Sequence, residues 1–407
     1  MNHELELTNV PDVYRDFLIK IHDKIRLFST VKILVVVDTE ISLTPGPAAF
    51  GVGRVIEFIR NTRVGCMRFN VTLARRSNAA PSINPSPAPN QPKYEGFRFD
   101  RKEPDGTTNT VDLFDEIWCF GFKPDNFGGP DANIFQPSAI PISDSELKVL
   151  TQWMNERQGG MFATGDHDYL GASMCSRMPR VGTMRLWTNA DGVPPIDGPD
   201  RIDTNRPANA AQADIAGSPA VMPFDNQSDA VPQPIDWVAW SSIRIAPLTY
   251  RRRPHPVLCH PKHGPINVMP DHPHEGRCFD TKINPVTGMA EIKLDGAYDF
   301  LGYAGEEYPT VGGIRPTPTV IAYGTTLPDP PYNHAKGDSP AKRFPMISVY
   351  DGHRIDIGRV AVDSTWHHWM DINLTDLEAA ADKMNWEKIS RYFVNLAVWL
   401  APPAIPR

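Results

Sequence analysis

Three short segments combine acidic residues with histidines at points where a predicted strand ends. The groups are Asp166, His167 and Asp168; Asp271, His272, His274 and Glu275; and Asp363, His367 and His368. Carboxylates and imidazoles perform general acid and base catalysis, and both also bind divalent metals. Ligands of open α/β sheets bind beyond the carboxyl ends of the strands, so we expect the three groups to form one polar site.

The segment 271–275 has the pattern of a metal site. His272 and His274 are two residues apart, which places both imidazoles on the same side of an extended chain. With carboxylates nearby, this donor set suits zinc, manganese or iron, and a metal-bound hydroxide then attacks an ester, amide or glycosidic carbon. Without a metal, the same groups supply an acid and a base. We predict metal ligands at Asp271, His272, His274 and His367, and catalytic residues at Asp166, His167, Asp168 and Glu275.

Simpler interpretations exist for several of these residues. A single histidine or aspartate at a strand end is more often a structural residue that caps a loop. His367 and His368 are adjacent, so only one faces the site, and we favour His367. His255, His260 and His263 alternate with prolines in a predicted hairpin, and we interpret them as surface residues or as residues that support the site.

Other catalytic motifs are absent or incomplete. The sequence contains neither GxSxG nor GxxxxGK[ST], and Cys175 is expected to serve in packing. The glycines Gly51 and Gly53 lack the third glycine of a dinucleotide fingerprint, despite Arg75 and Arg76 at the end of a strand. Three further arginines either hold an anionic substrate or form plain ion pairs: Arg177, Arg180 and Arg185.

Composition excludes several classes of protein. The net charge of −7 gives no general reason to bind nucleic acid. No apolar run is long enough to span a membrane and the first residues do not form a signal peptide, so we expect a cytoplasmic protein. Five cysteines without CxxC spacing argue against a disulfide framework.

The 41 prolines are about twice the usual share of roughly 5%. They cluster in segments that we interpret as insertions of long ordered loops, at about 78–108, 188–250 and 280–345. The shorter pieces beyond them lack the length for a second core. We therefore expect a single elaborated domain over residues 1–407.

The hydrophobic pattern predicts an α/β fold with a mainly parallel sheet. Helices are expected at 11–27, 54–63, 143–159 and 385–403, the third opening with a capping box of Ser143 and Glu146 and the last closing the sheet. Strands are expected at 31–38, 67–76, 114–122, 161–166, 255–260, 318–324, 344–354 and 358–366.

Three stretches resemble a known family. "GGMFATGDHDYLG" at 159–171, "PDHPHEG" at 270–276 and the ending that begins with "GRVAVDSTWHHW" at 358 resemble the ThuA-like (trehalose utilisation) branch of the class I glutamine amidotransferase-like fold. The resemblance implies a flavodoxin-type three-layer architecture. It also implies a pocket around His167, Glu275 and either His367 or His368. The turn carries Asp166 and His167 where amidotransferases carry the nucleophilic cysteine, so a cysteine-dependent glutaminase is not expected.

These observations leave competing hypotheses for function. The first is a hydrolase or lyase that acts on a small substrate, carbohydrate-derived or other. It works with or without a divalent metal, and the protein is either a monomer or a homo-oligomer. The second is a noncatalytic binding or assembly module whose insertions contact a partner. A nicotinamide-dependent reductase is a third and weaker hypothesis.

Overall fold

The structure is a computed structural model, and we describe residues 30–38, 41–47, 51–121, 142–165, 175, 177–185, 232–246, 249–270, 278–279, 281, 292–325 and 343–403. The predicted helix at 11–27 lies outside these residues. None of the described helices is both long and apolar enough to cross a membrane.

Five parallel strands form the centre of a 12-stranded sheet, in the order β18-β7-β6-β1-β3. These strands are β1 (Thr30–Val37), β3 (Met67–Arg75), β6 (Glu116–Gly121), β7 (Gly160–Gly165) and β18 (Val360–Asp363). β1, β6 and β7 are apolar and almost entirely buried, which is typical of strands covered on both faces. The predicted strands in this region are confirmed. We call the side of the sheet at which these five strands end the carboxyl edge.

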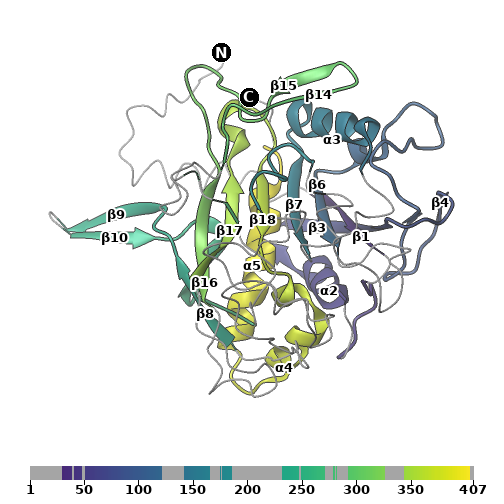
Figure 1. Cartoon of the computed structure of the whole chain (residues 1–407). Coiled ribbons are helices and arrows are strands. Elements are labelled where there is room, and N and C mark those ends of the chain that lie inside the picture. Colours follow the sequence, from purple (N-terminus) through teal and green to yellow (C-terminus); the bar gives the residue numbers. More distant parts are fainter. Residues whose placement is uncertain are drawn as a thin grey trace, which may run out of the picture.

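The remainder of the sheet is mostly antiparallel, so the prediction of a mainly parallel sheet holds only for its centre (Figure 1). β17 (Arg343–Tyr350) runs antiparallel to β18, and β16 (Thr319–Thr325), β8 (Pro232–Trp237) and β13 (Val268–Pro270) continue the alternation. Four strands of this kind need no helical crossover. At the other side, β2 (Arg63–Val64), β4 (Ser82–Ile83) and β5 (Tyr94–Glu95) extend the sheet from β3.

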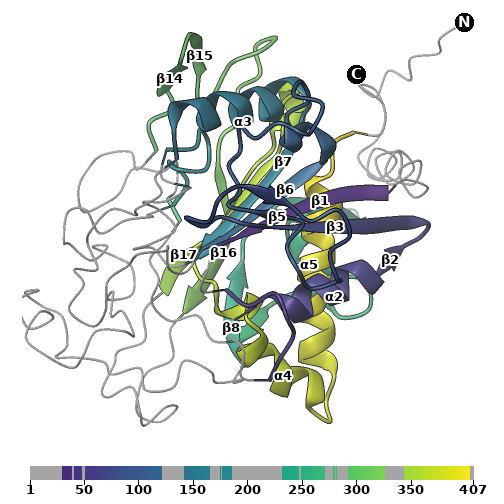
Figure 2. The same ribbon diagram turned by 90° about the vertical axis from the view of Figure 1, so that its right-hand side faces the viewer.

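Helices lie on both faces of the sheet (Figure 2). One face packs against α3 (Asp144–Glu156), and the other packs against α2 (Gly53–Asn61), α4 (Asp371–Ala379) and α5 (Met384–Leu400). The apolar residues of β1 alternate between the two resulting cores. Their arrangement confirms an α/β architecture with a helical layer on each face.

The capping box and the terminal helix are confirmed. Ser143 Oγ accepts the Glu146 N–H at 3.2 Å, and Glu146 Oε2 accepts the Ser143 N–H at 3.0 Å. On α5, the predicted apolar stripe is completely buried; it consists of Ile389, Phe393, Leu396 and Leu400. The helix α4 was not predicted.

The segment 255–260 is not the predicted strand. His255 precedes a 3₁₀ helix, η5 (Pro256–Leu258), because Pro256 favours the first helical position and His255 Nδ1 accepts the Val257 N–H. Only β11 (Cys259–His260) is extended, and it forms a hairpin with β12 (Gly264–Pro265). Two other hairpins are β9 (Ser241–Ala246) with β10 (Thr249–Arg253) and β14 (Ala297–Phe300) with β15 (Tyr303–Glu306). Further 3₁₀ helices are η3 (Thr110–Leu113), η6 (Gly352–Ile355) and η7 (His367–Trp369).

Candidate functional site

Most of the predicted site residues lie outside the described part of the chain. This applies to Asp166, His167, Asp168, Asp271, His272, His274 and Glu275, and to the side chain of His367. The residues that flank them are described. Their positions bear on whether the three predicted groups belong to one region.

β7 ends at the carboxyl edge in a glycine that its backbone requires. Gly165 has a φ of 143°, which side-chain-bearing residues rarely adopt, and its carbonyl accepts a hydrogen bond of 2.6 Å from Arg185 Nη2. The preceding Thr164 donates its hydroxyl to the Asp363 and Thr365 carbonyls at 3.2 and 3.1 Å. The end of β7 is thus joined to the end of β18.

Asp363, the last residue of β18, is the centre of a buried polar network. Its Oδ2 lies 2.7 Å from His368 Nε2 and accepts hydrogen bonds from the Tyr392 hydroxyl at 3.0 Å and from Trp369 Nε1 at 3.4 Å. Burial and the nearby carboxylate raise the pKa of Tyr392 well above its ordinary value, so the phenol stays protonated and donates. The network joins β18, η7 and α5.

Two atoms of this network have no hydrogen-bond partner among the described residues: Asp363 Oδ1 and His368 Nδ1. Because Asp363 Oδ2 occupies Nε2 of His368, Nδ1 is the ring nitrogen that has no hydrogen-bond partner among these residues. Both side chains are fully buried. The hydrogen bonds of Asp363 to His368 and Trp369 therefore hold η7, which begins at His367, against the end of β18.

The residues on both sides of the segment 271–277 lie close to η7 and to the end of β7. β13, which ends at Pro270, runs in the same direction as β18 and lies beside η7. Cys278 donates its N–H to the Pro345 carbonyl at 2.9 Å and its thiol to Met346 O at 3.2 Å. Cys278 also forms a β-bridge with Arg185, the residue bound to the end of β7.

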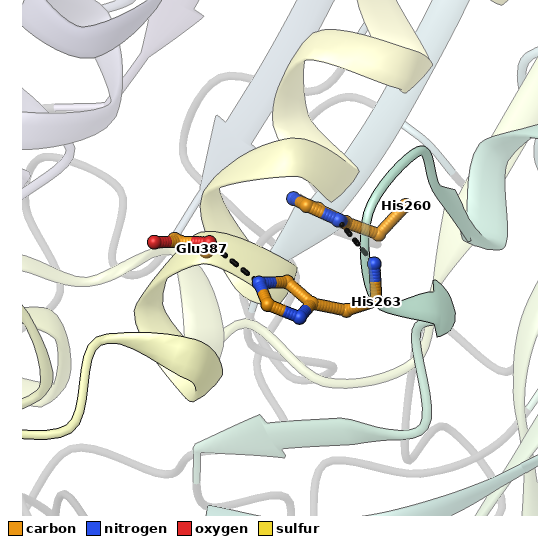
Figure 3. A group of neighbouring side chains, drawn as sticks. All are labelled: His260, His263 and Glu387. Atoms are coloured by element: carbon orange, nitrogen blue, oxygen red, sulfur yellow. Dashed lines mark hydrogen bonds and ion pairs between the residues drawn. The ribbon is translucent and has the colours of Figure 1, made fainter.

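A second group of histidines was missed by the sequence interpretation (Figure 3). His260, His263 and Glu387 each offer one ligand atom, and these atoms all lie within 4.8 Å of one another. The alternation with prolines suggests surface or supporting residues, and the sequence gives no sign of the third member, because Glu387 comes from the first turn of α5. The HxxH spacing was the available signal.

The interpretation of His255 as a surface residue is wrong. Its side chain is 1% exposed and packs edge-on against Trp240 and Trp399. Burial, with a smaller contribution from Arg359, lowers its pKa to about 3, so the imidazole is neutral. His255 serves the core and the start of η5.

The arginines and Cys175 have structural surroundings. Arg177 forms an exposed ion pair with Asp144 at 2.5 Å. Arg180 is buried, with its Nη2 donating to Asn155 Oδ1 at 2.7 Å. Cys175 is fully buried, which confirms its expected role in packing, and burial raises its pKa.

The described residues of the β1–α2 loop, 41–47 and 51–53, do not have the geometry of a dinucleotide site. A Cβ at Gly51 would lie 2.5 Å from Ser42 O, and a Cβ at Gly53 would lie 2.4 Å from Pro45 N, so both glycines permit close packing of the loop. The first turn of α2, where a phosphate would bind, is occupied by Asp371, whose Oδ1 accepts the Arg54 N–H at 2.8 Å. This arrangement argues against the reductase hypothesis.

Comparisons of the chain with protein-family models, with curated proteins and with solved structures found no significant match.

Proposed function

We propose that the protein is a hydrolase or lyase for a small polar substrate and that its active site lies at the carboxyl edge, beside the ends of β7, β18 and β13. One observation supports this proposal. Arg185 donates a hydrogen bond to the Gly165 carbonyl and forms a β-bridge with Cys278. Gly165 directly precedes the predicted group at 166–168, and Cys278 follows the predicted group at 271–275. Both residues lie beside β18, whose last residue, Asp363, begins the third group.

In this proposal the chemistry comes from side chains that follow those strands. His167, flanked by Asp166 and Asp168, moves a proton to or from the reacting group, and Glu275 is its acid or base partner. Asp271, His272, His274 and His367 hold a divalent metal, which would lower the pKa of a bound water. A carbohydrate-derived substrate rests on the ThuA-like resemblance alone.

Substitution of two histidines tests this function. In a screen of chromogenic esters, amides and glycosides, we expect His167→Ala and His274→Ala each to lower kcat/KM by about 100-fold or more. Asp295→Asn is the matched control, because Asp295 is exposed and precedes β14, which packs near the end of α3 at the opposite edge. Activity that survives both histidine substitutions would contradict the proposal.

A second candidate function is a noncatalytic binding module. It is favoured by the β9–β10 hairpin, which lies at the end of the predicted 188–250 insertion and extends away from the sheet (Figure 1). The hairpin is preceded by Trp240, which is 43% exposed, and its β10 strand has the basic sequence "TYRRR". Under this alternative, replacing 241–253 with a short linker abolishes biological activity, whereas His167→Ala and His274→Ala have no effect.

A further inference from the structure

We propose that His260, His263 and Glu387 form a divalent zinc site that fastens the β11–β12 hairpin to α5. This site is separate from the metal site proposed above and does not depend on it. Two imidazoles and one carboxylate form a donor set that binds zinc in proteins with one position left for water. All three side chains are partly exposed, so an ion and its water have access.

The two elements that carry the ligands are already held together. Asn395 Nδ2, on α5, donates to the Cys259 carbonyl at 2.8 Å and to the Val257 carbonyl at 3.1 Å. Lys388 Nζ, also on α5, donates to Asn267 Oδ1 at 2.7 Å. The ligand backbones are therefore positioned before the metal arrives, which reduces the entropy cost of binding.

The protonation states favour a cation. Hydrogen bonds from His263 and Lys262 lower the pKa of Glu387, so the carboxylate is ionised at neutral pH. Burial, assisted by His263 and Arg391, lowers the pKa of His260, so this imidazole is neutral and has a lone pair. His263 Nε2 already lies 2.5 Å from Glu387 Oε2 (Figure 3).

Zinc binding changes three features of this site. Zinc replaces the hydrogen bond between His263 Nε2 and Glu387 Oε2, and the His263 proton moves to Nδ1 or to solvent. Lys262 Nζ lies 3.3 Å from Glu387 Oε2 and competes for the same carboxylate. His260 Nδ1 accepts the N–H groups of Lys262 and His263 at 3.1 and 3.0 Å, so the proton of the neutral ring is on Nε2. Binding of zinc to Nε2 moves that proton to Nδ1 and releases the two backbone donors. Zinc binding is thus coupled to a change in the turn 261–263.

The hairpin leads directly to the proposed active site. β12 is followed by β13, whose last residue, Pro270, precedes the predicted ligand Asp271. A zinc ion between the hairpin and α5 would therefore hold β13 in place, and we expect added zinc to raise the melting temperature.

Zinc titration of tag-free, metal-depleted protein against a chromophoric chelator tests this proposal. Glu387→Gln and His263→Ala should each weaken the binding of one zinc equivalent by more than about 100-fold, beyond the range of about 10- to 100-fold that is typical of outer ligand partners. Lys262→Ala should tighten the same equivalent by about two- to fivefold, because it removes an exposed competing charge. An effect in this direction does not result from misfolding.

The double variant His272→Ala/His274→Ala serves as the control. It should retain this equivalent even if it loses another, which separates failure of this site from failure of the proposed active site. Equal zinc binding by the wild type, Glu387→Gln and His263→Ala would overturn the proposal, as would weaker binding by Lys262→Ala.

Discussion

His368 Nε2 lies 2.7 Å from Asp363 Oδ2, and neither side chain is exposed. The Tyr392 hydroxyl donates to the same oxygen, so one carboxylate at the end of β18 connects η7 to α5. Removal of one partner from a buried charged group leaves that charge poorly solvated, which costs more than the hydrogen bond itself contributes. This network should therefore be sensitive to small substitutions.

We expect Tyr392→Phe to lower the free energy of unfolding by about 1.5–3 kcal/mol, because a buried carboxylate loses a donor. Tyr298→Phe is the control; its hydroxyl accepts a hydrogen bond from Asn155 in a half-buried position and should cost less than about 1 kcal/mol. Urea denaturation measures both values. Equal losses of unfolding free energy in the two variants would show that the hydrogen bond to Asp363 stabilises the fold no more than an ordinary half-buried one.

The pair Arg76–Glu146 provides a second test. Arg76 Nη1 lies 2.5 Å from Glu146 Oε1, both side chains are buried, and Glu146 also caps α3. Glu146→Ala leaves a buried guanidinium without its carboxylate and should cost about 3–5 kcal/mol.

Asp144, like Glu146, lies on α3. Asp144→Ala removes its exposed ion pair with Arg177 and should cost less than about 1 kcal/mol. Thermal and urea denaturation of the two variants give the comparison. A Glu146→Ala cost as small as that of Asp144→Ala would contradict the assignment of a buried ion pair.

Asp371 predicts a dependence of stability on pH. Burial raises its pKa from 3.8 to about 7, against the opposing effect of the Arg54 and Gly46 N–H groups. Between pH 3.8 and about 7, the folded protein therefore holds a proton on Asp371 that the unfolded chain has lost. The stability that this proton contributes decreases as the pH rises through that range.

Between about pH 5 and 8, the wild type should lose about 2–3 kcal/mol more unfolding free energy than Asp371→Asn. Urea titrations of both proteins at several pH values measure this difference. Parallel pH profiles of the wild type and the variant would be inconsistent with a protonated Asp371 in the folded state.

The central elements of the fold could be predicted because local pattern determines them. The buried run in β1 and the reciprocal Ser143–Glu146 cap on α3 are visible in the sequence without any tertiary information. The antiparallel strands β16 and β17 have the same apolar character as parallel ones, so the sequence did not reveal their direction. The prediction of a strand at 255–260 is wrong because Pro256 starts a 3₁₀ turn within an apolar stretch.

The candidate sites show the same limit. His260 and His263 meet Glu387 only because the hairpin packs on α5, more than a hundred residues later in the chain. Asp371 likewise comes from a distant helix, α4, and its carboxylate accepts a hydrogen bond from the first turn of α2. It occupies the place where a phosphate would bind, so the incomplete glycine motif does not form a dinucleotide site. Contacts between segments distant in sequence leave no local pattern to recognise.

The central claim is that the segments after β7 and β13 contribute to one site. Paired cysteines test it most directly: His167→Cys/His274→Cys and His167→Cys/Asp295→Cys, both with Cys66→Ser to remove the exposed native thiol. A short bifunctional thiol reagent joins only thiols within the span of one small ligand, and peptide mass spectrometry detects the product. We predict rapid crosslinking of 167 with 274 and none of 167 with 295. Crosslinking of 167 with 274 no faster than with 295 would contradict a single site.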